Sequence, residues 1–150
     1  MNFFEPPFHQ SRAFVAVFFS WFIAQLIKVV IGRMREKRYN LRWMIKTGGM
    51  PSAHSATVSS LATATGLYYG FNSLPFLIVL IFTIITMFDA AGVRRNVGRQ
   101  AILLNKILDE FQEKGQVAEQ KVKELLGHTP VEVFAGAFLG ILVAYIVCGF

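Results

Sequence analysis

The hydrophobic and polar positions divide the chain into long apolar runs separated by charged stretches. Three runs, at about 13–32, 74–88 and 130–150, consist almost entirely of aliphatic, aromatic and small residues. A run of about 20 such residues is long enough to cross a bilayer as a helix. A fourth run, at 52–70, is rich in Ala, Ser, Thr and Gly, which is typical of a helix packed closely inside a bundle. The pattern therefore predicts about four transmembrane helices.

Between the third and fourth spans the pattern changes. Residues 93–128 place apolar side chains at helical spacing between charged ones. We interpret this segment as a cytoplasmic, amphipathic helical insert, either one helix or two helices broken at Gly115. The expected fold class is therefore all-α: a single integral membrane domain over 1–150, in which a polytopic helix bundle carries this insert.

The composition supports a membrane protein. Apolar residues make up 54% of the chain and charged residues only 16%, more apolar surface than a soluble domain of 150 residues would bury. The formal net charge is +6, and the basic residues flank the apolar runs. This placement favours anionic phospholipids or phosphate as partners over nucleic acid. The single cysteine, Cys148, excludes an intramolecular disulfide.

The basic residues also predict the orientation in the membrane. The loop at 33–46 carries six basic residues against one acidic residue, Glu36. The positive-inside rule places such a loop in the cytoplasm. Both basic loops then lie on that side and both termini on the other. We expect a bacterial inner membrane protein whose candidate polar motifs all face the cytoplasm.

The stretch 46–55 contains the most distinctive turn in the chain. Gly48 and Gly49 permit backbone turns and a close ligand approach that a side chain would block. Pro51 suits the first position of a helix, because its missing N–H would be unpaired there. The pattern predicts a helix N-terminus with exposed amides, which is a natural anion site.

Three side chains around this turn are of types that bind anions or transfer protons. Lys46 is positively charged, Ser52 has a hydroxyl group, and His54 is a proton donor that titrates near neutral pH. The alternative interpretation is the ordinary start of a helix with a surface histidine.

A second candidate motif contains His128 and Glu132, which share a face of a continuous helix because they are four residues apart. A carboxylate beside an imidazole fixes its tautomer and raises the basicity of the other nitrogen, as in a nucleophile or a general base. Thr129, Pro130 and Glu132 also form the pattern of a capping box, so Glu132 has a purely structural alternative. The two interpretations are compatible.

Further charged residues lie close to these motifs. Asp89 precedes Arg94 and Arg95, and paired guanidinium donors near a glycine suit phosphate oxygens. The alternatives are an interfacial ion pair for Asp89, and topology determination or anionic-lipid contact for Arg94, Arg95 and Arg99. Lys28 lies inside the first span, where it either extends to the interface or has a functional role.

Two other interpretations concern metals and assembly. His54, Asp89, His128 and Glu132 are residue types that bind zinc or manganese. No two of them have a typical ligand spacing, however, and the basic surroundings favour an anion, so we expect no metal. Gly136, Gly140 and Ala144 place a small residue at every fourth position of the last span, which makes a homo-oligomer plausible.

Four segments in order resemble a known group. They are Gly48-Gly-Met-Pro-Ser-Ala-His-Ser55, Asp89-Ala-Ala-Gly-Val-Arg-Arg95, Gly98-Arg-Gln-Ala101 with Leu104-Asn105, and Gly127-His-Thr-Pro-Val-Glu-Val133. Together they resemble the divergent branch of the type-2 phosphatidic acid phosphatase superfamily, which also includes vanadium-dependent haloperoxidases. The resemblance covers nearly the whole chain.

Compared with the superfamily pattern, the second element, Pro-Ser-Gly-His, has Ala53 in place of glycine. In the third element, Glu132 replaces the usual aspartate, and Lys121-Val122 stands where Ser-Arg is expected. Lys28 and Arg35 have the spacing of the first element, but Glu36 replaces its proline. The third-element arginine is therefore missing, and Arg94, Arg95 or Arg99 would have to substitute for it.

The resemblance implies a lipid phosphate or lipid diphosphate phosphatase that needs no metal or cofactor. It implies that His128 attacks phosphorus, that Glu132 holds His128, and that His54 protonates the leaving oxygen and then activates water. The implied phosphate-binding residues are Lys28, Arg35, Lys46, Ser52 and Arg94 or Arg95, with Gly48, Gly49, Asp89 and Arg99 in support. Phosphatidylglycerophosphate, phosphatidate and prenyl diphosphates are all compatible substrates.

A different class of function remains open at this point. A non-catalytic scaffold, a lipid-binding protein, or an oligomeric channel or transporter would use the same intramembrane charges for binding or ion passage. Four spans are few for a transporter protomer, so a transporter would require an oligomer.

Overall fold

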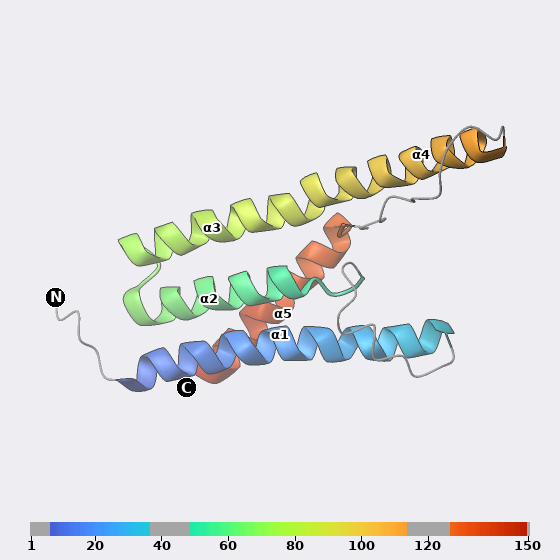
Figure 1. Cartoon of the computed structure of the whole chain (residues 1–150). Helices are drawn as coiled ribbons and strands as arrows, with labels where there is room; N and C mark the ends of the chain where they lie inside the picture. Colours follow the sequence, from blue (N-terminus) through green and yellow to red (C-terminus); the bar gives the residue numbers. More distant parts are fainter. Residues whose placement is uncertain (1–6, 37–48, 114–126, 150) are drawn as a thin grey trace.

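The computed structural model describes residues 7–36, 49–113 and 127–149, and their regular structure is entirely α-helical (Figure 1). The helices are α1 (Pro7–Glu36), α2 (Ala53–Tyr69), α3 (Leu74–Ala91), α4 (Val93–Glu113) and α5 (Pro130–Cys148). The predicted all-α helix bundle is confirmed.

Three stretches of the described residues are long and apolar enough to cross a membrane. They lie in α1, in the helical run that starts with α3, and in α5. The fourth predicted span, α2, is not among them, because it has only 17 residues and many of them are serine and threonine. This helix packs inside the bundle, as its small residues predicted, and contacts α1, α3 and α5.

The closest packing in the bundle joins α2 to α5 through two glycines. A Cβ atom on Gly136 would overlap the carbonyl oxygen of Ser52, and one on Gly140 would overlap that of Ala56. Both helices therefore approach to backbone contact, which only glycine permits. This finding corrects our use of the small-residue stripe as support for an oligomer, because the stripe faces α2 of the same chain. A homo-oligomer stays a prediction.

Alanines allow α1 to pack against the same pair of helices. Near the start of α2, Ala24 packs with Ala53 and Ala56. At the far end of α2, Ala16 packs with Ala64 and Ala144. The core consists largely of small side chains, so the helices are held by close approach and not by large interlocking residues.

The third and fourth helices face outward. Most apolar side chains of α3 are exposed, as expected of a helix surrounded by lipid. The helix ends at Ala91, and α4 continues almost in the same direction away from the bundle (Figure 1). The predicted insert thus begins at Val93, and its proposed break at Gly115 lies outside the described residues.

The most informative differences from the predicted helix boundaries are in α1 and at the start of α2. The first helix extends beyond 13–32 in both directions, because its polar flanks at Pro7–Arg12 and Arg33–Glu36 contain nothing that breaks a helix after Pro7. The second helix begins at Ala53 with Ser52 as its N-cap, so Pro51 precedes the cap instead of occupying the first helical position. Pro130 does occupy that position in α5.

We expect Gly140→Ala to destabilise the protein by roughly 1–3 kcal/mol, because the added methyl group forces α5 away from α2. Thermal unfolding in detergent measures this effect. Val131→Ile is the matched control, since it adds one carbon atom to the same helix at an exposed position. Equal melting temperatures for the two variants would show that backbone contact between α2 and α5 is not required.

Candidate functional site

The N-termini of α2 and α5 meet, and the end of α3 joins them. The backbone N–H of Ser52, the N-cap of α2, donates to the carbonyl oxygen of Glu132 at 2.9 Å. The backbone N–H of His128 donates to the carbonyl oxygen of Ala90 in α3 at 3.1 Å. Three distant parts of the sequence therefore converge at one end of the bundle, where two helix N-termini present partial positive charge.

The start of α2 is shaped by the glycine-proline turn. Gly49 has a φ angle of +86°, a conformation that favours glycine. The Ser52 hydroxyl accepts hydrogen bonds from the Ser55 backbone N–H at 3.3 Å and from the Ser55 hydroxyl at 3.1 Å. Because its hydroxyl accepts from the Ser55 N–H, Ser52 is the N-cap of α2, and it is fully buried. Its predicted contact with phosphate stays a prediction.

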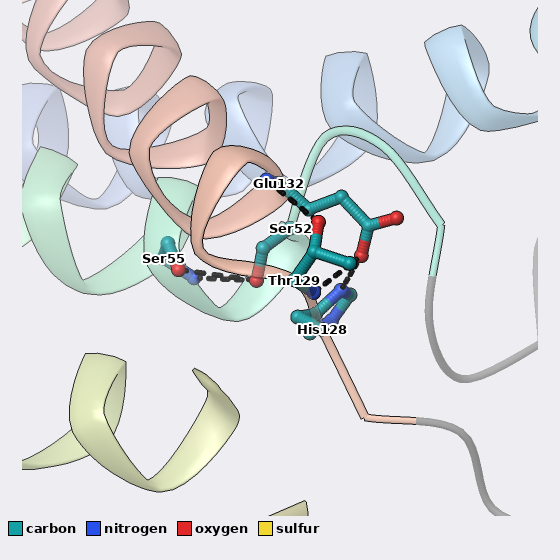
Figure 2. Close-up of polar contacts among 5 residues, drawn as sticks. All are labelled: Ser52, Ser55, His128, Thr129 and Glu132. Carbon is teal, nitrogen blue, oxygen red and sulfur yellow. Dashed lines mark hydrogen bonds and ion pairs between the residues drawn. The ribbon is translucent and has the colours of Figure 1, made fainter. Parts of the chain in front are cut away.

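His128 is buried and bound to Glu132. Its Nδ1 lies 3.2 Å from Oε2 of Glu132, and only 3% of the residue is exposed (Figure 2). When Nδ1–H donates to the carboxylate, Nε2 carries the lone pair of the ring. The carboxylate thus orients the imidazole as the spacing of the two residues predicted.

The same carboxylate also caps α5. Oε2 of Glu132 accepts a hydrogen bond from the Thr129 backbone N–H at 3.1 Å, and the Thr129 hydroxyl accepts one from the Glu132 backbone N–H at 3.4 Å (Figure 2). These reciprocal bonds form a complete capping box. The predicted capping box is present, and the same carboxylate contacts His128, so the start of α5 and the orientation of His128 depend on one side chain. A catalytic role for the pair stays a prediction.

The two histidines face each other across the junction of the helices. The ring centroids of His54 and His128 are 6.3 Å apart, and the ring planes are inclined at 63°. His54 is exposed in the first turn of α2, whereas His128 is buried. The exposed imidazole of His54 therefore lies beside the buried imidazole of His128.

Lys28 is enclosed by the protein. This residue of α1 is 4% exposed, so its side chain does not extend along the surface to the interface. The negative charge of Glu132 acts on its ammonium group, yet no carboxylate of the described residues lies within 4 Å of it. A buried cation without a close counterion is costly, and an anionic ligand would reduce that cost.

The remaining predicted residues are less informative. Asp89 is half-buried at the end of α3, beside the carbonyl group that binds His128, and Arg99 is exposed on α4. The backbones of Arg35, Arg94 and Arg95 lie in α1 and α4, but their side chains are outside the described part of the structure, as are Lys46 and Gly48.

Two features of the site were not predicted. The hydrogen bond from the His128 backbone N–H to the Ala90 carbonyl could not be predicted from the sequence, because a backbone contact does not require a particular residue type. The close contact between Gly136 of α5 and the Ser52 carbonyl was also not predicted. The small-residue stripe pointed to a close helix contact, but we interpreted it as a contact between copies of the chain. Within the described ranges, His, Cys, Asp and Glu form no group of three that would hold a metal ion.

Comparisons with known proteins agree with this architecture. Residues 9–143 match the model of the family described as the Divergent PAP2 family. The chain is also 41% identical over 138 residues to the uncharacterized membrane protein YuiD of Bacillus subtilis (strain 168), covering 85% of this chain and 87% of that protein. No solved structure matches the chain. With its apolar helices and this relative, the chain is an integral membrane protein, and it belongs to the Divergent PAP2 family.

Proposed function

We propose that this protein is a lipid phosphate phosphatase that works through a phosphohistidine intermediate on His128. The observation that carries the proposal is the His54–His128 pair, with rings 6.3 Å apart and one ring held by Glu132. One imidazole fixed by a carboxylate and a second, exposed imidazole are the two groups that a double-displacement phosphoryl transfer needs.

In the first step, Nε2 of His128 attacks phosphorus and the bond from phosphorus to the lipid oxygen breaks. Protonated His54 gives its proton to that oxygen, so the lipid alcohol leaves; with a lipid diphosphate the bond that breaks is to the bridging oxygen, and the lipid monophosphate leaves. In the second step, His54 removes a proton from water and the resulting hydroxide attacks the phosphohistidine. The P–N bond breaks, inorganic phosphate leaves, and both histidines return to their starting states.

The charge of the transferred phosphoryl group is balanced by buried and helical positive charge. Lys28 is buried and lies close enough to Glu132 to be affected by its charge, and the N-termini of α2 and α5 meet at the site. Preorganised charge of this kind usually supplies the largest share of rate acceleration. We propose that Arg35, Lys46 and Arg94 or Arg95 contribute further, and that no metal or cofactor takes part.

The substrate is proposed to come from the cytoplasmic leaflet of the bacterial inner membrane. The basic residues at 33–46 and 94–99 lie on the same side as the histidine pair under the positive-inside rule. We propose that a phosphate headgroup in that leaflet lies at the level of the two imidazoles. Lipid monophosphates and diphosphates both present the required terminal phosphoryl group.

We expect the purified protein to release phosphate from one or more lipids in a panel of lipid phosphates. His128→Ala should lower the rate by roughly 10⁴-fold or more, because it removes the nucleophile. Vanadate should inhibit the reaction, since it occupies the phosphate site, whereas a chelator should have no effect.

Vanadate, the chelator and a measurement of lipid phosphate binding distinguish the proposed phosphatase from a metal-dependent enzyme and from a protein that only binds lipid. Inhibition by the chelator would contradict the metal-independent mechanism. If no lipid in the panel is hydrolysed while lipid phosphates still bind, the protein is a lipid-binding protein or scaffold and not an enzyme.

The two roles of Glu132 are separable by substitution. Glutamine is also accepted at this position of a capping box, so Glu132→Gln should keep the cap of α5 but remove the charge that orients His128. We expect activity to fall roughly 10³–10⁴-fold with little change in melting temperature. Thr129→Ala should show the reverse, with a loss of about 1 kcal/mol of stability and most of the activity kept. Similar profiles for both variants would mean that Glu132 acts only as a cap.

The proposed orientation is tested by cysteine labelling. In a Cys148→Ser background, Asn72→Cys places one exposed thiol before α3, and Arg99→Cys places one after α3, in α4. A membrane-impermeant maleimide added to intact cells should label Asn72→Cys but not Arg99→Cys. The opposite result would place the histidine site outside the cytoplasm.

A further inference from the structure

An apolar stripe runs along α4, and no described helix covers it. Its members are each 41–60% exposed: Val93, Val97, Leu104, Ile107 and Phe111. Among the described helices, α4 contacts only α3, the helix that precedes it. These five residues, which we call the α4 stripe, therefore form an exposed apolar surface of the kind that marks an interaction site.

The α4 stripe has the spacing of a coiled-coil seam. At about 100° per residue, its members and Gln100 fall within an arc of roughly 80° on the helix. They occupy consecutive positions a and d of a heptad repeat: Val93, Val97, Gln100, Leu104, Ile107 and Phe111. Only one of these positions is polar. Arg99, Lys106 and Asp109 are exposed on the opposite side of the helix.

The positions beside the stripe are compatible with a second, parallel α4. In a parallel pair, position g of one helix lies next to position e of the following heptad in the other. Leu103 is at position g and Leu108 at position e, so the two leucines would extend the apolar contact. No like charges meet at this pair of positions.

The length of the helical run places the stripe outside the hydrocarbon core. The 18 residues of α3 span about 27 Å, close to the thickness of about 30 Å that a membrane helix must cross. Since α4 continues in almost the same direction, its 21 residues extend roughly 32 Å further (Figure 1). A helix that buries its apolar face in lipid lies in the plane of the membrane instead. This direction favours protein as the partner of the stripe.

Membrane insertion restricts how two copies of the chain meet. The loop charges give every copy the same orientation, so a two-fold axis that relates two copies is parallel to the membrane normal. Helices that leave the membrane close to this axis then pair in parallel, and identical residues of the two stripes face each other. Because α3 fixes the direction of α4, less freedom is lost when the helices pair.

We propose that the α4 stripe is the dimerisation surface of this protein, and that it packs against the same stripe of a second copy as a short parallel coiled coil. The surface differs from the glycine stripe of α5, which packs against α2 of the same chain. The proposal does not depend on the phosphatase function. It places Gln100 in the seam, where a polar residue specifies the register of the two helices.

Cysteine crosslinking in membrane vesicles tests the contact residue by residue. In a Cys148→Ser background, Leu104→Cys and Ile107→Cys should each form disulfide-linked dimers on mild oxidation, because positions a and d face their counterparts. Arg99→Cys and Lys106→Cys are the matched controls on the opposite, exposed side and should stay monomeric. Equal crosslinking at all four positions, or none at the two stripe positions, would overturn the proposal.

The direction of pairing is tested with two differently tagged chains in one membrane. Val97→Cys and Phe111→Cys lie near opposite ends of the stripe. In a parallel pair, each variant should crosslink only to its own kind. Crosslinks between the two variants would show an antiparallel pair and contradict the parallel coiled coil.

A charge in the stripe should weaken the dimer. We expect Leu104→Glu to raise the dimer Kd by about tenfold or more, as measured by sedimentation in detergent, because pairing would bury an unpaired carboxylate. Lys106→Glu places the same side chain on the opposite side and should leave the Kd unchanged. An unchanged melting temperature of the dilute protein controls for folding, since Leu104 is 48% exposed. Equal Kd values for the two variants would contradict a seam at the stripe.

Lipid is the competing partner of the stripe. We expect Leu104→Cys to react with a membrane-impermeant maleimide in inverted vesicles when the protein is diluted to monomers, and to be protected when it is dimeric. Protection at every protein density, together with absence of crosslinking, would assign the stripe to the bilayer surface and overturn the proposal.

Discussion

The site depends on the backbone contact between α2 and α5. Because Gly136 and Gly140 have no side chains, α5 lies directly on the carbonyl groups of Ser52 and Ala56. That approach brings the two helix N-termini together, as the hydrogen bond from Ser52 to Glu132 shows. Since His54 follows one N-terminus and His128 precedes the other, the packing of α2 against α5 determines the distance between the imidazoles.

A second constraint is that one carboxylate serves both structure and chemistry. Glu132 completes the capping box of α5, orients His128, and is the negative charge that acts on buried Lys28. A buried charge near a membrane must be compensated by local partners, so these groups are energetically linked. An anion near Lys28 and the histidines would balance the buried positive charge, which is why we propose phosphate and not a cation as the ligand.

Most of the fold could be predicted from the sequence, because apolar run lengths and the small-residue composition of α2 report directly on membrane helices. The pairing of His128 with Glu132 was predictable too, because helical spacing and the capping pattern both act locally. The approach of His54 to His128 depends on tertiary packing, and it was expected only through the resemblance. The glycine stripe was assigned to the wrong contact, since small residues favour close approach without specifying which helix approaches. The charges of the site are the least predictable part, because long basic side chains from loops can converge in many ways.

The most direct measurement of the central claim is to trap the covalent intermediate. The protein is mixed with a lipid phosphate, quenched in alkali, which preserves a phosphoramidate bond, and digested for mass spectrometry. We predict a phosphoryl group on His128 alone, which accumulates when His54→Asn removes the base that activates water. A phosphoryl group on any other residue, or phosphate release with no phosphohistidine in either protein, would contradict the account.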